Sequence, residues 1–299
     1  MTSHTPLGVT FGSLGVLGPG AILDIARSAQ DQGYQSLWTV EATGTDAFSL
    51  LGGVAAVAPG LDLATGIIPV QLRAPTLVAM TASTLQALSP ERDIWLGGGV
   101  SAPGILQQHG ETATERPIAM MREYVALLRE CMSGESVTFE GDFWSVKRFR
   151  LGMRIGDKQP KIVMAALNPQ MLKLAGEIAD GVLLNYLPAS HVGESIQQVR
   201  KGGNAKVFAY VHAAVSDFER YAQSARKDLF NYAMADSYAN MFRKAGFADE
   251  IEALRTCHKA RDRDGALAAI SDRMIQAIDF IGNDQEVTGF VQDYIDAGV

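Results

Sequence analysis

The stretch Lys161–Pro188, KIVMAALNPQMLKLAGEIADGVLLNYLP, contains a complete strand–helix–strand unit and decides the fold class. Lys161–Ala166 is a short apolar run of the kind that forms a buried strand, and Gly181–Asn185 is a second. Between them, Pro169–Ala179 has apolar residues at helical spacing. Two strands joined by a helix can lie parallel in one sheet, so this stretch predicts a βαβ unit.

The same alternation extends over most of the chain. Alternating strands and helices predict a parallel sheet, and seven such units favour a single (β/α)₈ TIM-barrel domain over residues 1–299 rather than an open, doubly wound sheet. The other strands are expected at Leu7–Phe11, Ser36–Val40, Leu61–Ile68, Asp93–Gly99 and Ala205–Ala214, and the other helices at Ala21–Gln32, Asp46–Val57, Pro75–Leu88, Arg116–Met132 and Val192–Arg200.

Two regions depart from the regular repeat. Residues 138–146 are expected to form a small hairpin around Glu140-Gly141, and residues 216–298 to be mostly helical, with breaks near Gly246, Gly265 and Gly282. The last helix is expected to reach Ala297, with Gly298 after it as a cap. We therefore expect a helical insertion before the last strand and no eighth strand in the sequence, so that either the chain is cut short or another segment fills the gap.

Composition and charge argue against several classes of protein. The chain has 299 residues, is 47% hydrophobic and carries a net charge of −7, with no basic stripe suited to nucleic acid. It has neither an apolar run long enough to cross a membrane nor a secretion signal. Cys131 and Cys257 lack metal-binding spacing and suit a reducing compartment. We expect a cytoplasmic protein that acts on a small molecule, without membrane or nucleic-acid partners.

The ends of the predicted strands are mostly apolar, and TIM barrels place their sites at these ends. In WLGGGVSAP, Trp95–Pro103, a buried strand runs into three glycines. Glycine gives up side-chain packing, so we expect something flat to approach this backbone. Zinc-ligand sets, nucleophile elbows and phosphate-loop motifs are missing from the sequence, so no metal site is expected. A ring system whose phosphate lies near Ser101–Ala102 and the helix start at Asn168 fits this pattern, with the cofactor supplying the chemistry.

Four stretches resemble the luciferase-like flavin and deazaflavin oxidoreductase superfamily. They are residues 63–103, RPIAMMREYVALLR at 116–129, VTFEGDFWSV at 137–146, and the opening stretch. Within the last, LAGEIADGVLLN is similar to the branch that uses the deazaflavin coenzyme F420 and includes the methylenetetrahydromethanopterin reductases. The resemblance implies a TIM barrel, a homodimer, and an F420-dependent oxidoreductase that moves a hydride to or from the deazaflavin C5.

The resemblance also implies roles for individual positions. In this branch the third strand ends in a bulge with a non-proline cis peptide that backs the ring, and the matching bond here is Gly66–Ile67. The full implied set of cofactor-binding residues is Phe11, Thr65, Gly66, Ile67, Gly99, Val100, Ser101, Ala102, His109, Ala165, Ala166, Leu167, Asn168 and Asn185.

At the end of the second strand, several relatives carry an acidic residue followed by a catalytic histidine. Here the matching pair is Glu41-Ala42, so the histidine's role is unfilled and Glu41 is the candidate catalytic residue. The alternative for Glu41 is a cap on the helix that starts near Asp46. Arg73 is expected to form a salt bridge, with contact to an acidic coenzyme tail as the alternative.

Structural alternatives also stand beside the other assignments. The alternative for Gly97–Gly99 is a tight layer of the barrel, for His109 an ordinary loop residue, and for Asn168 a helix N-cap. Asp180-Gly181 is expected to be a turn. Two other functions stay open: an FMN-dependent luciferase-like monooxygenase that activates oxygen, and a non-catalytic barrel that binds a flavin.

Overall fold

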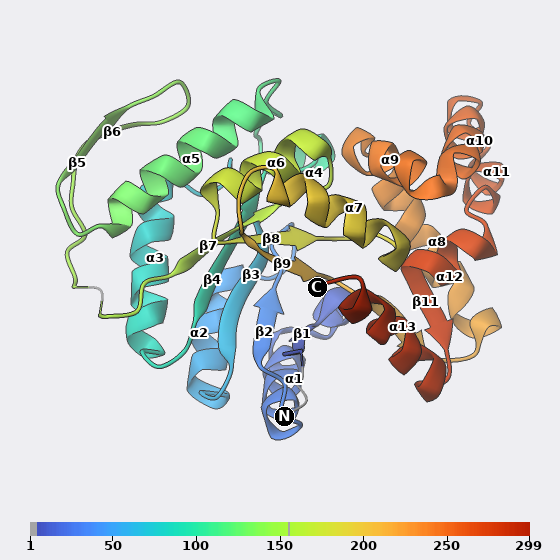
Figure 1. Cartoon of the computed structure of the whole chain (residues 1–299), viewed down its shortest axis with the longest axis horizontal. Coiled ribbons are helices and arrows are strands. Elements are labelled where there is room, and N and C mark those ends of the chain that lie inside the picture. The colour runs from blue at the N-terminus through green and yellow to red at the C-terminus, as the bar shows by residue number, and fades with distance from the viewer. Residues whose placement is uncertain (1–4, 155) are drawn as a thin grey trace. The chain divides into compact units, whose positions relative to one another are not determined.

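The computed structural model describes residues 5–154 and 156–299, which form an α/β fold with one parallel sheet of seven strands (Figure 1). The strands hydrogen-bond in the order β1-β2-β3-β4-β7-β8-β9, as predicted for a barrel that lacks its eighth strand. The chain divides into two compact units. The first holds the residues up to Ala165 together with Ile178–Gly181, and the second holds Ala166–Glu177 and Val182–Val299.

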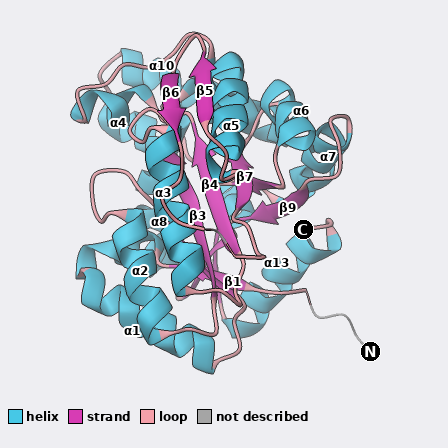
Figure 2. Cartoon of the chain, turned by 90° about the vertical axis from the view of Figure 1, so that its left-hand side faces the viewer, coloured by secondary structure: helices cyan, strands magenta, loops and turns pink. Residues whose placement is uncertain are grey.

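The first unit contains the parallel strands that alternate with helices along the chain. Figure 2 shows the helices α1, α2 and α3 beside these strands. Every residue of β4 is buried, and β3 is buried except at Asp62 and Ile67, which are half-buried. The strands are β1 (Gly8–Thr10), β2 (Ser36–Thr39), β3 (Asp62–Pro69), β4 (Ile94–Gly99) and β7 (Lys161–Ala165), and the helices are η1 (Gly12–Leu17), α1 (Pro19–Asp31), α2 (Ala47–Val57), α3 (Pro75–Leu88), α4 (Pro103–Gln108) and α5 (Pro117–Met132).

The predicted hairpin is present as β5 (Val137–Glu140) and β6 (Ser145–Phe149). Its turn is anchored on α5, because the carboxylate of Glu123 accepts hydrogen bonds from the backbone N–H groups of three consecutive turn residues, Asp142, Phe143 and Trp144. The predicted turn before β8 is also confirmed. Asp180 accepts a hydrogen bond from the backbone N–H of Ile162 at 2.7 Å.

The second unit differs from the prediction in one strand and one helical region. The expected single strand Ala205–Ala214 is two strands, β9 (Lys206–Ala209) and β10 (His212–Val215), because the backbone turns away from the main sheet between them. β10 pairs in parallel with β11 (Asp279–Gly282), which lies in a region expected to be helical. One apolar run hid the break, and four residues are too few to show strand periodicity.

The remaining elements of the second unit are helical apart from β8. The predicted break at Gly246 is confirmed, since that residue has φ of +95°. The break expected near Gly265 lies just before it, at residues 260–262 between two helices, where Asp262 caps the second helix. The elements are α6 (Pro169–Ile178), β8 (Gly181–Leu184), α7 (Ala189–Arg200), α8 (Phe218–Ala233), α9 (Asp236–Phe242), η2 (Arg243–Phe247), α10 (Ala248–Lys259), α11 (Arg263–Ala268), α12 (Asp272–Ile278) and α13 (Asp284–Asp296).

Within the described ranges, no helix has both the length and the apolar character needed to cross a bilayer.

Candidate functional site

A bulge interrupts β3 near its carboxyl end, where a TIM barrel places its active site. The pairing of β3 with β4 shifts between Thr65 and Ile68. The peptide bond between Gly66 and Ile67 is cis, as the sequence resemblance implied. The hydroxyl of Thr65 donates to the carbonyl of Gly97 at 2.8 Å, so the start of the bulge is tied to the neighbouring strand.

The glycines of β4 are required by this bulge. A Cβ at position 97 would lie 1.9 Å from the carbonyl oxygen of Thr65, and one at position 99 would lie 2.8 Å from Cδ1 of Ile67. The second Cβ would also lie 3.1 Å from Cβ of Ala165 on β7. In this structure β3 therefore packs directly against Gly97 and Gly99. This is the tight layer of the barrel that the sequence analysis gave as the alternative to a cofactor contact.

Glu41 follows β2 and contacts the bulge directly. Its backbone N–H donates to the carbonyl of Ile67 at 3.2 Å. Its carboxylate accepts both a hydrogen bond from the backbone N–H of Ala47, the first residue of α2, at 3.1 Å and a two-pronged bond from Arg73. The helix-cap alternative for Glu41 and the predicted salt bridge of Arg73 are both present.

Asp46 completes this group of charges. It caps α2 by accepting from the backbone N–H of Ser49 at 2.6 Å, and it also accepts a hydrogen bond from Arg73. Burial acts to raise the pKa of Asp46, but the hydrogen bonds from Ser49 and Arg73 outweigh burial and leave that pKa below its ordinary value. The hydrogen bond to Glu41, followed by the nearby negative charges, raises the pKa of Arg73.

The segment after β4 differs from the long loop that was expected. It contains α4, and His109 follows that helix directly. The His109 side chain is exposed, and its Nε2 lies 2.7 Å from the carbonyl oxygen of Ala42. Val100 and Ser101 are half-buried, and the exposed Ala102 precedes the first turn of α4.

Phe11 is buried after β1 and packs in a cluster with Ile22 and Leu50. Two polar atoms near these strand ends are buried and have no hydrogen-bond partner among the described residues: Oγ1 of Thr10 and Nε2 of Gln71. The other side-chain atom of Gln71, Oε1, accepts from the backbone N–H of Ser101 at 3.4 Å. Sequence reasoning missed Gln71, although it lies three residues after the predicted strand end.

The predicted residues of the second unit lie at the ends of its strands and helices. Ala166 is buried, and Leu167 and Asn168 are half-buried before α6. The side-chain amide of Asn168 donates to the carbonyl of Ser237 at 3.0 Å. Asn185, which follows β8, is also half-buried.

Asn185 belongs to a polar and aromatic cluster that the sequence analysis did not identify. Its Nδ2 donates to the hydroxyl of Tyr238 at 2.9 Å, and its Oδ1 lies 2.8 Å from Nε2 of His212. The ring of Tyr186 stacks on His212 with centroids 3.8 Å apart, and Tyr232 packs on Tyr186 at 4.1 Å. Tyr232 and Tyr238 come from a region without a recognisable motif, so only the folded chain brings them to Tyr186.

Burial shifts the pKa values of the titratable groups in and beside this cluster. It lowers the pKa of His212 to about 4, so the imidazole is neutral at pH 7. Burial, with a smaller contribution from Asp228, raises the pKa of Asp279 to about 6. Asp279 pairs with His212 in the register of β10 and β11.

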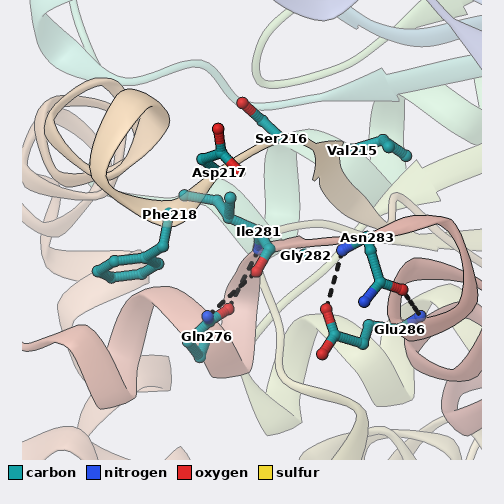
Figure 3. Close-up of a pocket in the computed structure, with 9 residues that line it drawn as sticks. All are labelled: Val215, Ser216, Asp217, Phe218, Gln276, Ile281, Gly282, Asn283 and Glu286. Atoms are coloured by element: carbon teal, nitrogen blue, oxygen red, sulfur yellow. Dashed lines mark hydrogen bonds between the residues drawn. The ribbon is translucent and has the colours of Figure 1, made fainter.

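A separate pocket of about 520 Å³ lies at the carboxyl ends of β10 and β11 (Figure 3). Three of its polar side chains bond to nearby backbone groups. Gln276 bonds to the backbone of Ile281, and Asn283 and Glu286 form the capping box of α13. None of the residues that line it is in the predicted cofactor set. The lining is Val215, Ser216, Asp217, Phe218, Gln276, Ile281, Gly282, Asn283 and Glu286.

Comparison with known proteins gives a consistent result. A family model described as luciferase-like monooxygenase matches residues 7–299. The 5,10-methylenetetrahydromethanopterin reductase of Methanolobus tindarius is 26% identical over 289 residues, which cover 93% of this chain and 87% of the relative.

Two solved structures share the fold at low sequence identity. The coenzyme F420-dependent tetrahydromethanopterin reductase of Methanopyrus kandleri aligns with a TM-score of 0.79 and 20% identity, over 98% of this chain and 90% of the other. The oxygenating constituent of 3,6-diketocamphane monooxygenase of Pseudomonas putida, solved in complex with FMN, aligns with a TM-score of 0.66 and 15% identity, over 98% of this chain and 88% of the other.

Proposed function

The chain belongs to the luciferase-like monooxygenase family, and from this premise we propose that it is an oxidoreductase that transfers a hydride between C5 of coenzyme F420 and a small organic substrate. The observation that carries the proposal is the ledge of main chain at the carboxyl ends of β3 and β4. There the bulge at Gly66–Ile67, which the sequence resemblance assigns to the back of the deazaflavin ring, packs against the glycine run of β4.

The residues near the β3 bulge fit a cofactor with a flat ring. The side chain of Ile67 is half-buried beside the ledge, and the unpaired Nε2 of Gln71 supplies a donor next to Ser101, where the sequence predicted a phosphate. A ring on the ledge would be held through apolar contact, with polar groups fixing its orientation. The proposed cofactor-binding set is the one that the sequence implied, with Gln71 added to it.

When bound, F420 supplies the atom that accepts or donates the hydride. The protein positions F420 and shields its ring from water. Thr65, Gly66 and Ile67 form the ledge, and Val100 and Ser101 border it in the sequence that follows β4. We propose that the enzyme works in the cytoplasm as a homodimer.

Titration of the purified protein with F420 and with FMN, each followed by absorbance and fluorescence, tests the proposal. We expect F420 to bind with a Kd in the micromolar range or below and FMN to bind at least tenfold more weakly. Reduced F420 should be oxidised only when an acceptor substrate is added, and no oxygen should be consumed.

The alternative is an FMN-dependent monooxygenase, which is favoured by the structural likeness to the FMN-containing monooxygenase component of Pseudomonas putida. Tight FMN binding with substrate-dependent oxygen uptake would establish it and exclude F420 as the natural cofactor. Binding of either cofactor without turnover of any compound in a broad substrate screen would favour the non-catalytic barrel.

A further inference from the structure

An ion-pair cluster borders the β3 bulge, and the proposed hydride transfer does not use it. We call Glu41, Asp46 and Arg73 the Arg73 cluster. The side chains of Arg73 and Glu41 are only 16% and 10% exposed. Removing such charges from water is costly, and replacing buried ion pairs with apolar residues is often neutral for stability. Stabilisation of the fold is therefore a weak explanation for this cluster. Its contacts instead support a role in holding the surrounding loops in one geometry.

The carboxylate of Glu41 is engaged in three hydrogen bonds. Oε1 accepts from Nε of Arg73 at 2.7 Å. Oε2 accepts from Nη2 of Arg73 at 2.7 Å and from the backbone N–H of Ala47 at 3.1 Å. A general base has to reach the proton that it removes, but here a planar guanidinium covers the carboxylate edge. This geometry suits a residue that holds other groups in place.

The groups that it holds surround the bulge. The backbone N–H of Glu41 bonds to the carbonyl of Ile67, and its carboxylate joins the start of α2 to the loop that carries Arg73. Two further contacts brace the same loops. The buried hydroxyl of Tyr124 on α5 donates to the carbonyl of Arg73 at 3.0 Å, and His109 contacts the carbonyl of Ala42.

We propose that the Arg73 cluster is a positioning device that sets the β3 bulge, and that Glu41 acts through this device and not as an acid or base. The identity of the molecule that rests on the bulge depends on the proposed function, and the positioning role depends only on the contacts given above. A defect in the cluster should therefore loosen the bulge in the protein without cofactor and weaken F420 binding as a consequence.

The test uses the full chain and the variants Glu41→Gln and Arg73→Lys. Both keep the size of the side chain but break the two-pronged pairing. The matched control is Arg116→Lys, because Arg116 pairs with Asp142 at 2.7 Å on the exposed surface of the same unit. Hydrogen exchange followed by mass spectrometry reports on peptides that cover residues 41–48 and 66–74, and F420 titration reports on affinity.

We expect both cluster variants to exchange faster in these two peptides and to bind F420 about tenfold more weakly, which is the effect typical of removing a group that orients a binding residue. The control should match the wild type in both measurements. Because both single variants break the same pairing, the double variant Glu41→Gln/Arg73→Gln should bind F420 about as weakly as each single variant. A general loss of structure would instead raise exchange throughout the chain.

Two results would overturn the proposal. One is exchange in residues 41–48 and 66–74 that matches the wild type in both cluster variants. The other is unchanged F420 affinity in Glu41→Gln, which is expected of a base that only acts in the chemical step. If the wild type itself fails to bind F420, the proposed function is wrong, and the exchange measurement alone decides the positioning role.

Discussion

Nε2 of His212 lies 2.8 Å from Oδ1 of Asn185, and this contact joins β10 to the end of β8. Because Nδ2 of Asn185 donates to Tyr238, its Oδ1 is left as an acceptor, and His212 then donates from Nε2. The amide thus selects one neutral tautomer of a half-buried imidazole. The stability of the protein should therefore depend on the protonation of this histidine.

The first prediction is that protonation of His212 destabilises the fold. Burial lowers its pKa from 6.5 to about 4, so between these values the unfolded chain binds more protons than the folded one. The contribution of the neutral imidazole is complete above pH 6.5 and is lost as pH falls toward 4. The free energy of unfolding of the wild type should therefore fall more steeply between pH 6.5 and 4.5 than that of His212→Gln, measured by urea denaturation.

His212→Gln can still donate an amide hydrogen bond to Asn185, so it should fold. His258→Gln is the control, because that histidine lies on α10 beside Phe230 and outside the cluster around Asn185. Equal pH dependence of His212→Gln and the wild type would contradict the prediction.

The second prediction concerns Asp279, whose pKa burial raises from 3.8 to about 6. Here the folded chain binds more protons between these values, so stability is lost as pH rises through 6. Asp279→Asn removes the buried charge and should raise the unfolding temperature at pH 7.5 by a few degrees. At pH 3.5, where the wild-type carboxyl is protonated, the difference should disappear. Destabilisation at pH 7.5 would show that the charge of Asp279 is needed.

The third prediction separates two neighbouring glycines of β4. Gly97→Ala should lower the free energy of unfolding by about 3 kcal/mol or prevent folding, because the new Cβ would lie 1.9 Å from a backbone oxygen that cannot move freely. Gly98→Ala should cost less than about 1 kcal/mol, since its nearest neighbour is the Val70 side chain at 3.3 Å. Denaturant titration measures both. Similar stability of the two variants would refute the packing role given to Gly97.

The fourth prediction is that the exposed face of α3 lies in a homodimer contact. Leu77, Met80 and Leu88 are 46%, 51% and 60% exposed and recur at helical spacing, an arrangement typical of a contact surface. Met80→Glu should convert a dimer to a monomer in light scattering at micromolar concentration. Val16→Glu, at a side chain that is 90% exposed on η1, should leave the dimer intact. A monomeric wild type would exclude this contact.

Much of the first unit was predictable because its signals are local. The expected helix at Pro75–Leu88 has the same bounds in the structure. Strands β2 and β4 differ from the expected ranges by one residue at one end, and β3 by one residue at each end. Proline at the helix start and an apolar run for each buried strand report on these elements without tertiary information. The second unit was harder, since β10 and β11 are four residues each and pair across more than sixty residues of helix.

For the site, the sequence by itself determined the fold class and the run of glycine in β4, because these depend on the order of residues along the chain, and the family resemblance supplied the position of the β3 bulge. Tertiary structure decided which groups meet. Only the folded chain shows that Glu41 is paired with Arg73, that β3 occupies the space beside Gly97, and that His212 stacks on Tyr186. Hydrogen-bond partners and burial depend on distances between segments that are far apart in the chain, and no local pattern of residue types records those distances.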